Sequence, residues 1–178
     1  KVVTNRKCAD MLKDLLLIPE DKFHIINDRD TLSLGDKTLE FILAPWVHWP
    51  ETMCTWLRED RILFSCDFFG SHLATADVFV KDEARVLDAA KRYYAEIMMP
   101  FRNQIQKNLD KLAAYTIEMI APSHGPVYPR PALIMDAYPV VIKLKDFIVV
   151  PFTVLLIGYW AAWYPVRYLT RKFLRKNV

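Results

Sequence analysis

Three side chains that can ligate a metal, His48, Asp67 and His124, each follow shortly after an apolar run with the composition of a β-strand. The runs span residues 39–43, 61–65 and 117–121. In α/β sheets, ligand and metal sites gather in the crevice outside the carboxyl ends of the strands. We therefore expect these three side chains to meet at one edge of a sheet.

Imidazole and carboxylate groups together form a nitrogen and oxygen ligand set that suits zinc, iron or manganese. Three such residues are too few for a structural zinc site, so an open or a binuclear centre fits better, with Asp67 able to bridge two metals. Taken singly, each residue has an ordinary alternative, since loop histidines are common and an aspartate after a strand often caps a turn. His72 and Glu51 lie near the ligands in the sequence and are expected to support them. No further catalytic group and no residue for binding an organic cofactor is expected.

The elements that position these residues are strands followed by helices. Two hairpins are predicted, one around the turn at 35–36 and one around the polar tip at 58–60. The apolar period then becomes helical from Asp82 to Pro100, and a second amphipathic helix follows. The other predicted elements are helices over 1–17 and 131–138 and strands over 23–27 and 117–121. This order predicts an α/β layered sandwich with helices on a sheet face.

Composition narrows the class of protein further. The 178-residue chain suits one domain with an appendage, and its formal charge of +3 without a basic stripe argues against nucleic-acid binding. Its three cysteines form no C-x-x-C pair, which predicts neither a disulfide framework nor a zinc ribbon and favours a reducing, cytoplasmic compartment. No signal-peptide pattern is visible after Lys1.

A run of twenty uncharged, largely apolar residues occupies 147–166, and a basic tail follows over 167–178. Twenty residues are just enough for a helix to span a bilayer, and tyrosines and tryptophans cluster toward the end of the run as in an interfacial belt. We expect 147–166 to be a helix that anchors the chain to a membrane. The alternative is a buried apolar helix, because Pro151 and Gly158 weaken a membrane span.

Four longer motifs occur in the order Ala-Pro-Trp-Val-His-Trp-Pro-Glu-Thr-Met at 44–53, Phe-Ser-Cys-Asp-Phe-Phe-Gly-Ser-His at 64–72, Tyr-Tyr-Ala-Glu-Ile-Met-Met-Pro-Phe at 93–101 and Ile-Ala-Pro-Ser-His-Gly-Pro at 120–126. Together they resemble the flavodiiron proteins, also called A-type flavoproteins or rubredoxin:oxygen oxidoreductases. The resemblance covers about residues 3–138. A generic metallo-β-lactamase-like hydrolase would share the ligands but not the first and third motifs.

The resemblance implies a metallo-β-lactamase-like αββα domain with a non-haem diiron centre that reduces dioxygen to water or nitric oxide to nitrous oxide. It implies that His48 is a ligand of one iron, that Asp67 bridges both irons and that His124 is a ligand of the other. In that family, electrons arrive through FMN in a flavodoxin-like domain, with a rubredoxin-type donor, and a head-to-tail homodimer brings the two centres together.

The chain departs from the family in three respects. No His-x-Glu-x-Asp-His motif, the family's source of the remaining ligands, occurs here, and no flavodoxin-like domain follows residue 138. The apolar run 147–166 has no counterpart in the usual architecture. We therefore interpret residues 1–140 as the C-terminal part of a diiron domain, in a fragment, a split protein or a degenerate product, which needs a second copy or a complementary half-domain. The alternatives are a membrane-tethered module without catalysis and a zinc-dependent hydrolase of the same fold.

Overall fold

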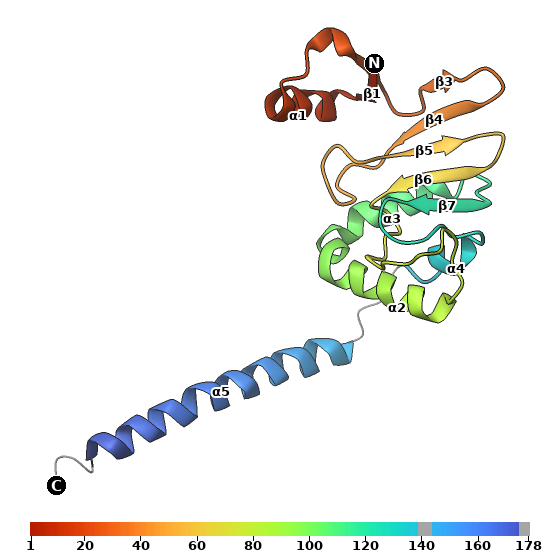
Figure 1. Ribbon diagram of the computed structural model, residues 1–178. Helices are drawn as coiled ribbons and strands as arrows, with labels where there is room; N and C mark the ends of the chain where they lie inside the picture. Colours follow the sequence, from red (N-terminus) through yellow and green to blue (C-terminus); the bar gives the residue numbers. More distant parts are fainter. Residues whose placement is uncertain (139–143, 175–178) are drawn as a thin grey trace. The chain divides into compact units, whose positions relative to one another are not determined.

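The computed structural model describes residues 1–138 and 144–174 and divides the chain into two compact units, Lys1–Val140 and Val141–Val178 (Figure 1). The first unit contains a five-stranded sheet with the order β3-β4-β5-β6-β7, a separate pair of strands β1-β2, and helices. This confirms the predicted α/β class. The strands of the large sheet are β3 (Thr31–Ser33), β4 (Thr38–Leu43), β5 (Met53–Leu57), β6 (Ile62–Cys66) and β7 (Met119–Pro122).

The two predicted hairpins are confirmed as β3-β4 and β5-β6, which are both antiparallel. Gly35 has a φ of +102°, a conformation that glycine adopts without strain, at the first turn. β4 pairs antiparallel with β5, whereas β6 and β7 are parallel. As a result, β4, β6 and β7 all run in the same direction.

The prediction of a single helix over 1–17 is wrong for its first residues. Val2–Asn5 form strand β1, which pairs in parallel with β2 (Phe23–Ile26), and helix α1 spans Arg6–Leu16. The β-branched residues at the start of the chain favour an extended backbone. Asn5 then begins the helix, because its side-chain Oδ1 accepts a hydrogen bond of 3.0 Å from the backbone N–H of Cys8.

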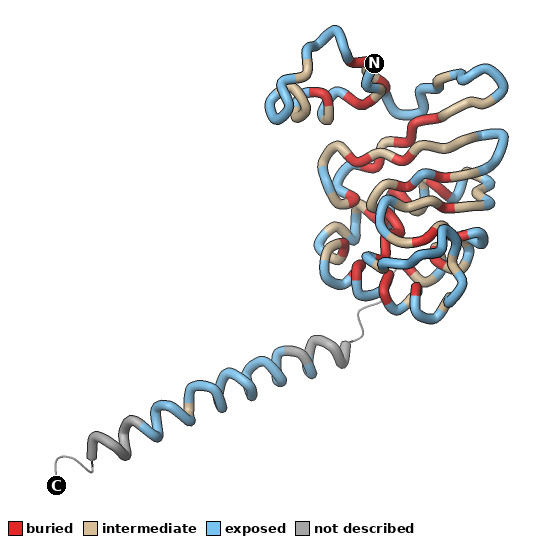
Figure 2. The backbone as a smooth tube through the Cα atoms, in the orientation of Figure 1, coloured by how far each residue is buried: buried red, intermediate tan, exposed pale blue. Residues whose placement is uncertain are grey.

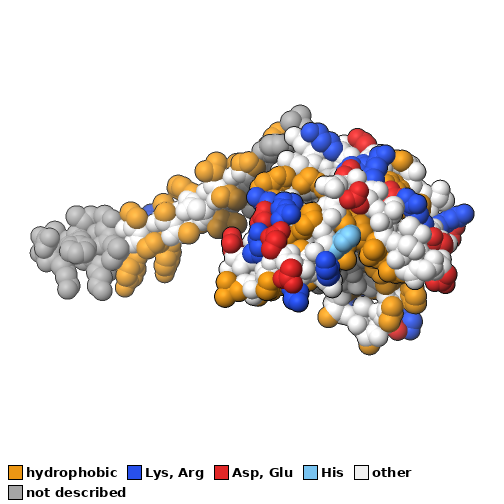
Figure 3. All heavy atoms as spheres, turned by 90° about the horizontal axis from the view of Figure 1, so that it is seen from above, with side chains coloured by type: hydrophobic (Ala, Val, Ile, Leu, Met, Phe, Trp, Pro, Cys, Tyr) orange, Lys and Arg blue, Asp and Glu red, His pale blue; other side chains and the backbone are white. Residues whose placement is uncertain are grey.

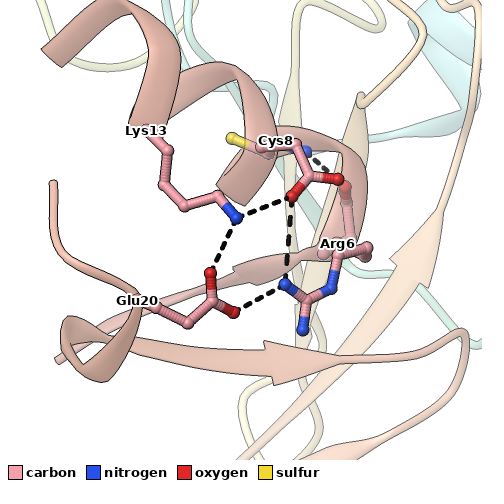
Figure 4. Close-up of polar contacts among 6 residues, drawn as sticks. Arg6, Cys8, Lys13 and Glu20 are labelled. Carbon is pink, nitrogen blue, oxygen red and sulfur yellow. Dashed lines mark hydrogen bonds and ion pairs between the residues drawn. The ribbon is translucent and has the colours of Figure 1, made fainter. Parts of the chain in front are cut away.

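An exposed ion-pair cluster fastens α1 to the turn that precedes β2. Figure 4 shows the Glu20 carboxylate between Arg6 and Lys13. Each of these basic groups lies 2.7 Å from Glu20, and the Asp10 carboxylate is 3.9 Å from Arg6 and 3.3 Å from Lys13. Hydrogen bonds from Lys13 and then Arg6 lower the pKa of Glu20 to about 2. The cluster therefore holds the β1-α1-β2 segment together through charges at its surface.

Helices cover one face of the large sheet. They are α2 (Glu83–Tyr93), the irregular turns η2 (Tyr94–Met98) and η3 (Met99–Phe101), α3 (Arg102–Leu112) and the short α4 (Ala132–Met135). Buried apolar side chains of α2 and α3, such as Ala90 and Ile105, pack with Leu63 of β6 and Ile120 of β7. Figure 2 shows that buried residues occur along both the strands and these helices. This layer is the core of the first unit.

The second unit contains one described helix, α5 (Leu144–Leu174), which includes the whole of the predicted apolar run 147–166. Hydrophobic side chains line its exposed surface in Figure 3. Within the described residues, no helix is found that is long and apolar enough to cross a membrane, so the membrane anchor predicted over 147–166 is not supported. Part of the predicted basic tail, residues 175–178, lies outside the described residues.

Candidate metal centre

The three predicted ligands lie at the same edge of the large sheet. Because β4, β6 and β7 run in one direction, their carboxyl ends share that edge, and each strand is followed by one ligand. His48 comes after β4, Asp67 directly after β6, and His124 two residues after β7. The structure therefore brings together the residues that the sequence separates by up to 76 positions (124 − 48).

The two imidazoles approach opposite oxygens of one carboxylate. His48 Nε2 lies 3.4 Å from Asp67 Oδ2, and His124 Nε2 lies 3.1 Å from Asp67 Oδ1. The Asp67 side chain is 18% exposed, whereas those of His48 and His124 are 24% and 45% exposed. The carboxylate is thus the shared, central group of the arrangement.

Short-range hydrogen bonds fix the loops that carry these residues. The Trp46 N–H donates to the Trp49 carbonyl at 2.8 Å, which closes the turn around His48. The Gly70 N–H donates to the Asp67 carbonyl at 3.1 Å. The Ser71 N–H donates to the His124 carbonyl at 2.9 Å, so the loops after β6 and β7 are joined directly.

His72, for which a supporting role is predicted, lies beside His124. The two rings are perpendicular, with centroids 4.8 Å apart, and the His72 ring also contacts that of Tyr93 at 4.3 Å. Tyr93, the last residue of α2, lies within the apolar helical period from Asp82 to Pro100, and the sequence pattern alone indicates no role for it at this site. Its hydroxyl is buried and has no hydrogen-bond partner among the described residues. Burial, and secondly the charge of Asp67, raise the pKa of this phenol.

Glu51 is held near the site but makes no hydrogen bond to a ligand. Its backbone carbonyl accepts a hydrogen bond of 2.7 Å from Asn5 Nδ2, and its buried Oε2 has no partner within the described part of the chain. Its side chain borders a cavity of about 490 Å³ that also reaches Asp67. The full lining is Thr4, Cys8, Trp49, Glu51, Thr52, Met53, Cys66 and Asp67. Burial, followed by the charge of Asp67, raises the pKa of the Cys66 thiol.

His48, Asp67 and His124 are of the residue types that bind metals, but they are fewer than the ligands that a complete metal site has. Asp67 offers one oxygen toward each imidazole, so each of two metal positions would receive one nitrogen and one carboxylate oxygen from this chain. Catalytic zinc sites, for comparison, use three protein ligands for one metal. In the described ranges 1–138 and 144–174, no group of three or more His, Cys, Asp and Glu side chains is arranged to hold a metal ion. The described donors are therefore fewer than a complete metal site requires.

Comparison with known proteins agrees with this geometry. The model of the ODP family beta lactamase matches residues 1–125. The type A flavoprotein of Rhodobacter capsulatus is 38% identical over 119 residues, which is 66% of this chain and 27% of that protein. A nitric oxide reductase of Moorella thermoacetica is 37% identical over 142 residues, 77% of this chain and 36% of the relative. The chain thus spans about a third of the length of these relatives.

Solved structures show the same fold. The flavodiiron protein of Giardia intestinalis superimposes with a TM-score of 0.71 at 35% identity, over 76% of this chain and 34% of that one. A fragment of a diflavin flavoprotein from Nostoc, residues 1–254, gives a TM-score of 0.68 at 26% identity, over 76% of this chain and 54% of the fragment. The chain belongs to the ODP family of β-lactamase domains and corresponds to part of the N-terminal diiron domain of flavodiiron proteins.

Proposed function

We propose that this chain provides half of the binuclear iron centre of a flavodiiron-type oxidoreductase, which reduces dioxygen to water or nitric oxide to nitrous oxide. In this proposal His48 is a ligand of one iron, His124 is a ligand of the other, and Asp67 bridges both. The remaining ligands come from a complementary part of the protein. Iron held there would supply the redox chemistry, and the role of this chain is to place three donors at one sheet edge.

The observation that carries the proposal is the approach of the two imidazoles to opposite oxygens of Asp67, at 3.4 and 3.1 Å. A carboxylate between two nitrogen donors is the arrangement that a pair of metals bridged by one residue requires. The relatives support the choice of chemistry, since one of them is named a nitric oxide reductase.

The proposal extends to organisation and partners. It assigns residues 1–140 to the diiron domain and leaves 147–166 and 167–178 outside it. Electrons would reach the centre from a flavodoxin-like FMN domain or a rubredoxin-type donor, in a homo-oligomer or with a complementary half-domain. A cytoplasmic location is supported by the three cysteines, all of which are free.

Metal binding tests the proposal directly. The full chain is dialysed anaerobically against a high concentration of Fe(II) or Zn(II), which detects weak binding by a half-site, and bound metal is measured by elemental analysis. We expect bound iron to be lost in Asp67→Ala and reduced by about half in His48→Ala and in His124→Ala. The control is Asp60→Ala, which alters an exposed carboxylate paired with Lys37 at the tip of the β5-β6 hairpin.

Three results would contradict the proposal. If the wild-type chain bound no iron, the proposed half-site would be refuted. If Asp67→Ala bound as much iron as wild type, the proposed bridging role of Asp67 would be refuted. Selective retention of zinc together with hydrolytic activity would favour a hydrolase of the same fold.

A further inference from the structure

Helix α5 exposes apolar side chains in every direction around its axis. Every residue from Pro151 to Ala162 is exposed, and most of them are apolar (Figure 3). Four consecutive residues, between 45% and 72% exposed, show this most clearly: Val154, Leu155, Leu156 and Ile157. Successive residues of an α-helix point about 100° apart, so these four cover the whole circumference. A continuous apolar surface of this extent marks a site that a partner or a membrane covers.

The extent of this surface argues against a second copy of the chain as its cover. A helix that packs on another protein element buries one apolar stripe, about 100° wide, and keeps a polar face toward water. In a bundle of copies, the outward side of each α5 helix would still expose some of residues 154–157. Hydrocarbon, by contrast, surrounds an immersed helix on all sides, which suits a helix that is apolar all round.

Toward its carboxyl end, α5 carries rings that suit the boundary between hydrocarbon and water. The ring centroid of Trp160 lies 6.1 Å from that of Tyr159 and 5.3 Å from that of Trp163. The Arg167 guanidinium lies 4.7 Å from the centre of the Trp163 ring. Tyrosine and tryptophan collect at lipid interfaces, because their bodies are apolar and their O–H or N–H groups are polar. Their position between 154–157 and Arg167 gives the order hydrocarbon, interface, headgroups.

The positive charge of the chain belongs to its second unit. Residues 141–178 contain seven basic residues and one acidic residue, a formal charge of +6 (7 − 1). The rest of the chain carries −3, from 17 basic (24 − 7) and 20 acidic (21 − 1) side chains. Arg167, Arg171 and Lys172 follow the aromatic residues in the sequence. Basic residues next to an apolar segment favour the negative surface of anionic phospholipids.

We propose that α5 binds this chain to a membrane surface that contains anionic phospholipids. The apolar residues of the helix contact acyl chains, the tyrosines and tryptophans lie at the base of the headgroups, and the basic residues that follow contact lipid phosphates. This contact does not require the helix to cross the bilayer. It is also independent of the metal centre, so it holds whether or not the first unit takes part in a binuclear site.

Flotation with lipid vesicles tests the proposal. The full chain is synthesised in a cell-free system with vesicles of phosphatidylcholine, or of phosphatidylcholine and phosphatidylglycerol in equal amounts, and the vesicles are floated over a range of lipid concentrations. We expect wild type to bind both, and the anionic vesicles at least tenfold more tightly. Leu155→Asp/Leu156→Asp should weaken binding to both at least tenfold, because it brings two carboxylates into contact with hydrocarbon.

The matched control is Leu15→Asp/Leu16→Asp, which makes the same change in another pair of adjacent leucines, 72% and 65% exposed, at the end of α1. It should bind neutral vesicles like wild type. Arg167→Gln/Arg171→Gln/Lys172→Gln should lose most of the preference for anionic vesicles, since each basic residue near such a surface contributes about fivefold (about 1 kcal/mol). Added salt should reduce the preference of wild type in the same way.

Fluorescence locates the contact within the chain. Brominated acyl chains quench tryptophans that touch hydrocarbon. The second unit contributes two tryptophans, Trp160 and Trp163, and the first unit contributes Trp46, Trp49 and Trp56. We expect brominated vesicles to quench wild type and to have little effect on Trp160→Phe/Trp163→Phe.

Several outcomes would overturn the proposal. They are a wild-type chain that does not float, equal binding by Leu155→Asp/Leu156→Asp and wild type, or equal loss in the α1 control. Quenching that persists in Trp160→Phe/Trp163→Phe would place the lipid contact in the first unit instead. Absence of flotation, together with a wild-type oligomer that Leu155→Asp/Leu156→Asp converts to a monomer in sedimentation, would assign the apolar surface to a second copy.

Discussion

Replacing Gly125 with alanine should strongly destabilise the first unit. Gly125 follows His124 in the loop after β7 and packs against Ser71, which lies in the loop that begins with Asp67. Gly125 has a φ of +104°, which residues with a side chain rarely adopt. A Cβ atom at this position would overlap Ser71 Oγ and lie 3.3 Å from Ser71 Cβ. Ser71 is fully buried, so it has no space into which to retreat.

The expected magnitude has two parts. Holding a non-glycine residue at this φ costs about 1–3 kcal/mol. Overpacking against Ser71 costs about 1–3 kcal/mol more. Their sum, about 2–6 kcal/mol, is a large fraction of the total stability of about 5–15 kcal/mol that a domain has. Urea unfolding of wild type and Gly125→Ala, followed by circular dichroism, measures the difference as a shift in the transition midpoint.

A second substitution separates the two parts. Ser71→Ala removes the overlapping oxygen, so Gly125→Ala/Ser71→Ala should recover about 1–3 kcal/mol of the loss, while the backbone strain remains. Ser71→Ala alone should cost no more than about 1 kcal/mol, because within the described residues Ser71 Oγ makes no hydrogen bond of good geometry. A double variant no more stable than Gly125→Ala would refute the steric explanation.

Two further predictions concern charged groups away from the metal edge. The pKa of Glu20 is lowered to about 2 in the folded chain, so its contribution to stability is present above its ordinary value of 4.5 and is lost as the pH falls toward 2. The stability difference between wild type and Glu20→Gln should therefore shrink from pH 5 to pH 2 in urea titrations, and a difference that is constant with pH would contradict it. Arg58→Met should cost about 2 kcal/mol, because it leaves the buried Glu40 carboxylate without its cation. Adding Glu40→Gln, which removes the charge but keeps an acceptor for the Tyr115 hydroxyl, should restore part of that loss in the same assay.

Local signals in the sequence were sufficient to predict the large sheet and its ligand edge. The turn at 35–36 and the polar tip at 58–60 mark hairpins, and hairpins fix the direction of their strands. A crossover that contains helices leads from β6 to β7, and a crossover of this kind favours parallel pairing of the two strands. The position of His124 beside Asp67 then followed from strand direction alone.

Two features could not be read from local patterns. β1 is only four residues long, and its partner β2 begins eighteen positions after β1 ends (23 − 5). No hairpin turn connects the two strands, so the local sequence does not predict that they pair. Tyr93 lies in a helix whose apolar residues recur at regular spacing. This spacing does not indicate whether the Tyr93 hydroxyl faces the core or the predicted ligands. Only the three-dimensional structure shows that the Tyr93 ring lies 4.3 Å from the ring of His72 and 6.3 Å from that of His124.

The sharing of the proposed binuclear site between this chain and a complementary part of the protein has a thermodynamic consequence. Asp67 faces His48 with one carboxylate oxygen and His124 with the other, so a part that supplies the remaining ligands must bind close to Asp67. The metal and that part would then each bind more tightly in the presence of the other, and the two enhancement factors must be equal because free energy is a state function. Metal that binds only the assembled site would raise the equilibrium constant for assembly by a factor of one plus its free concentration divided by its dissociation constant. Metal availability would in this way determine how much of the chain is in its complete form.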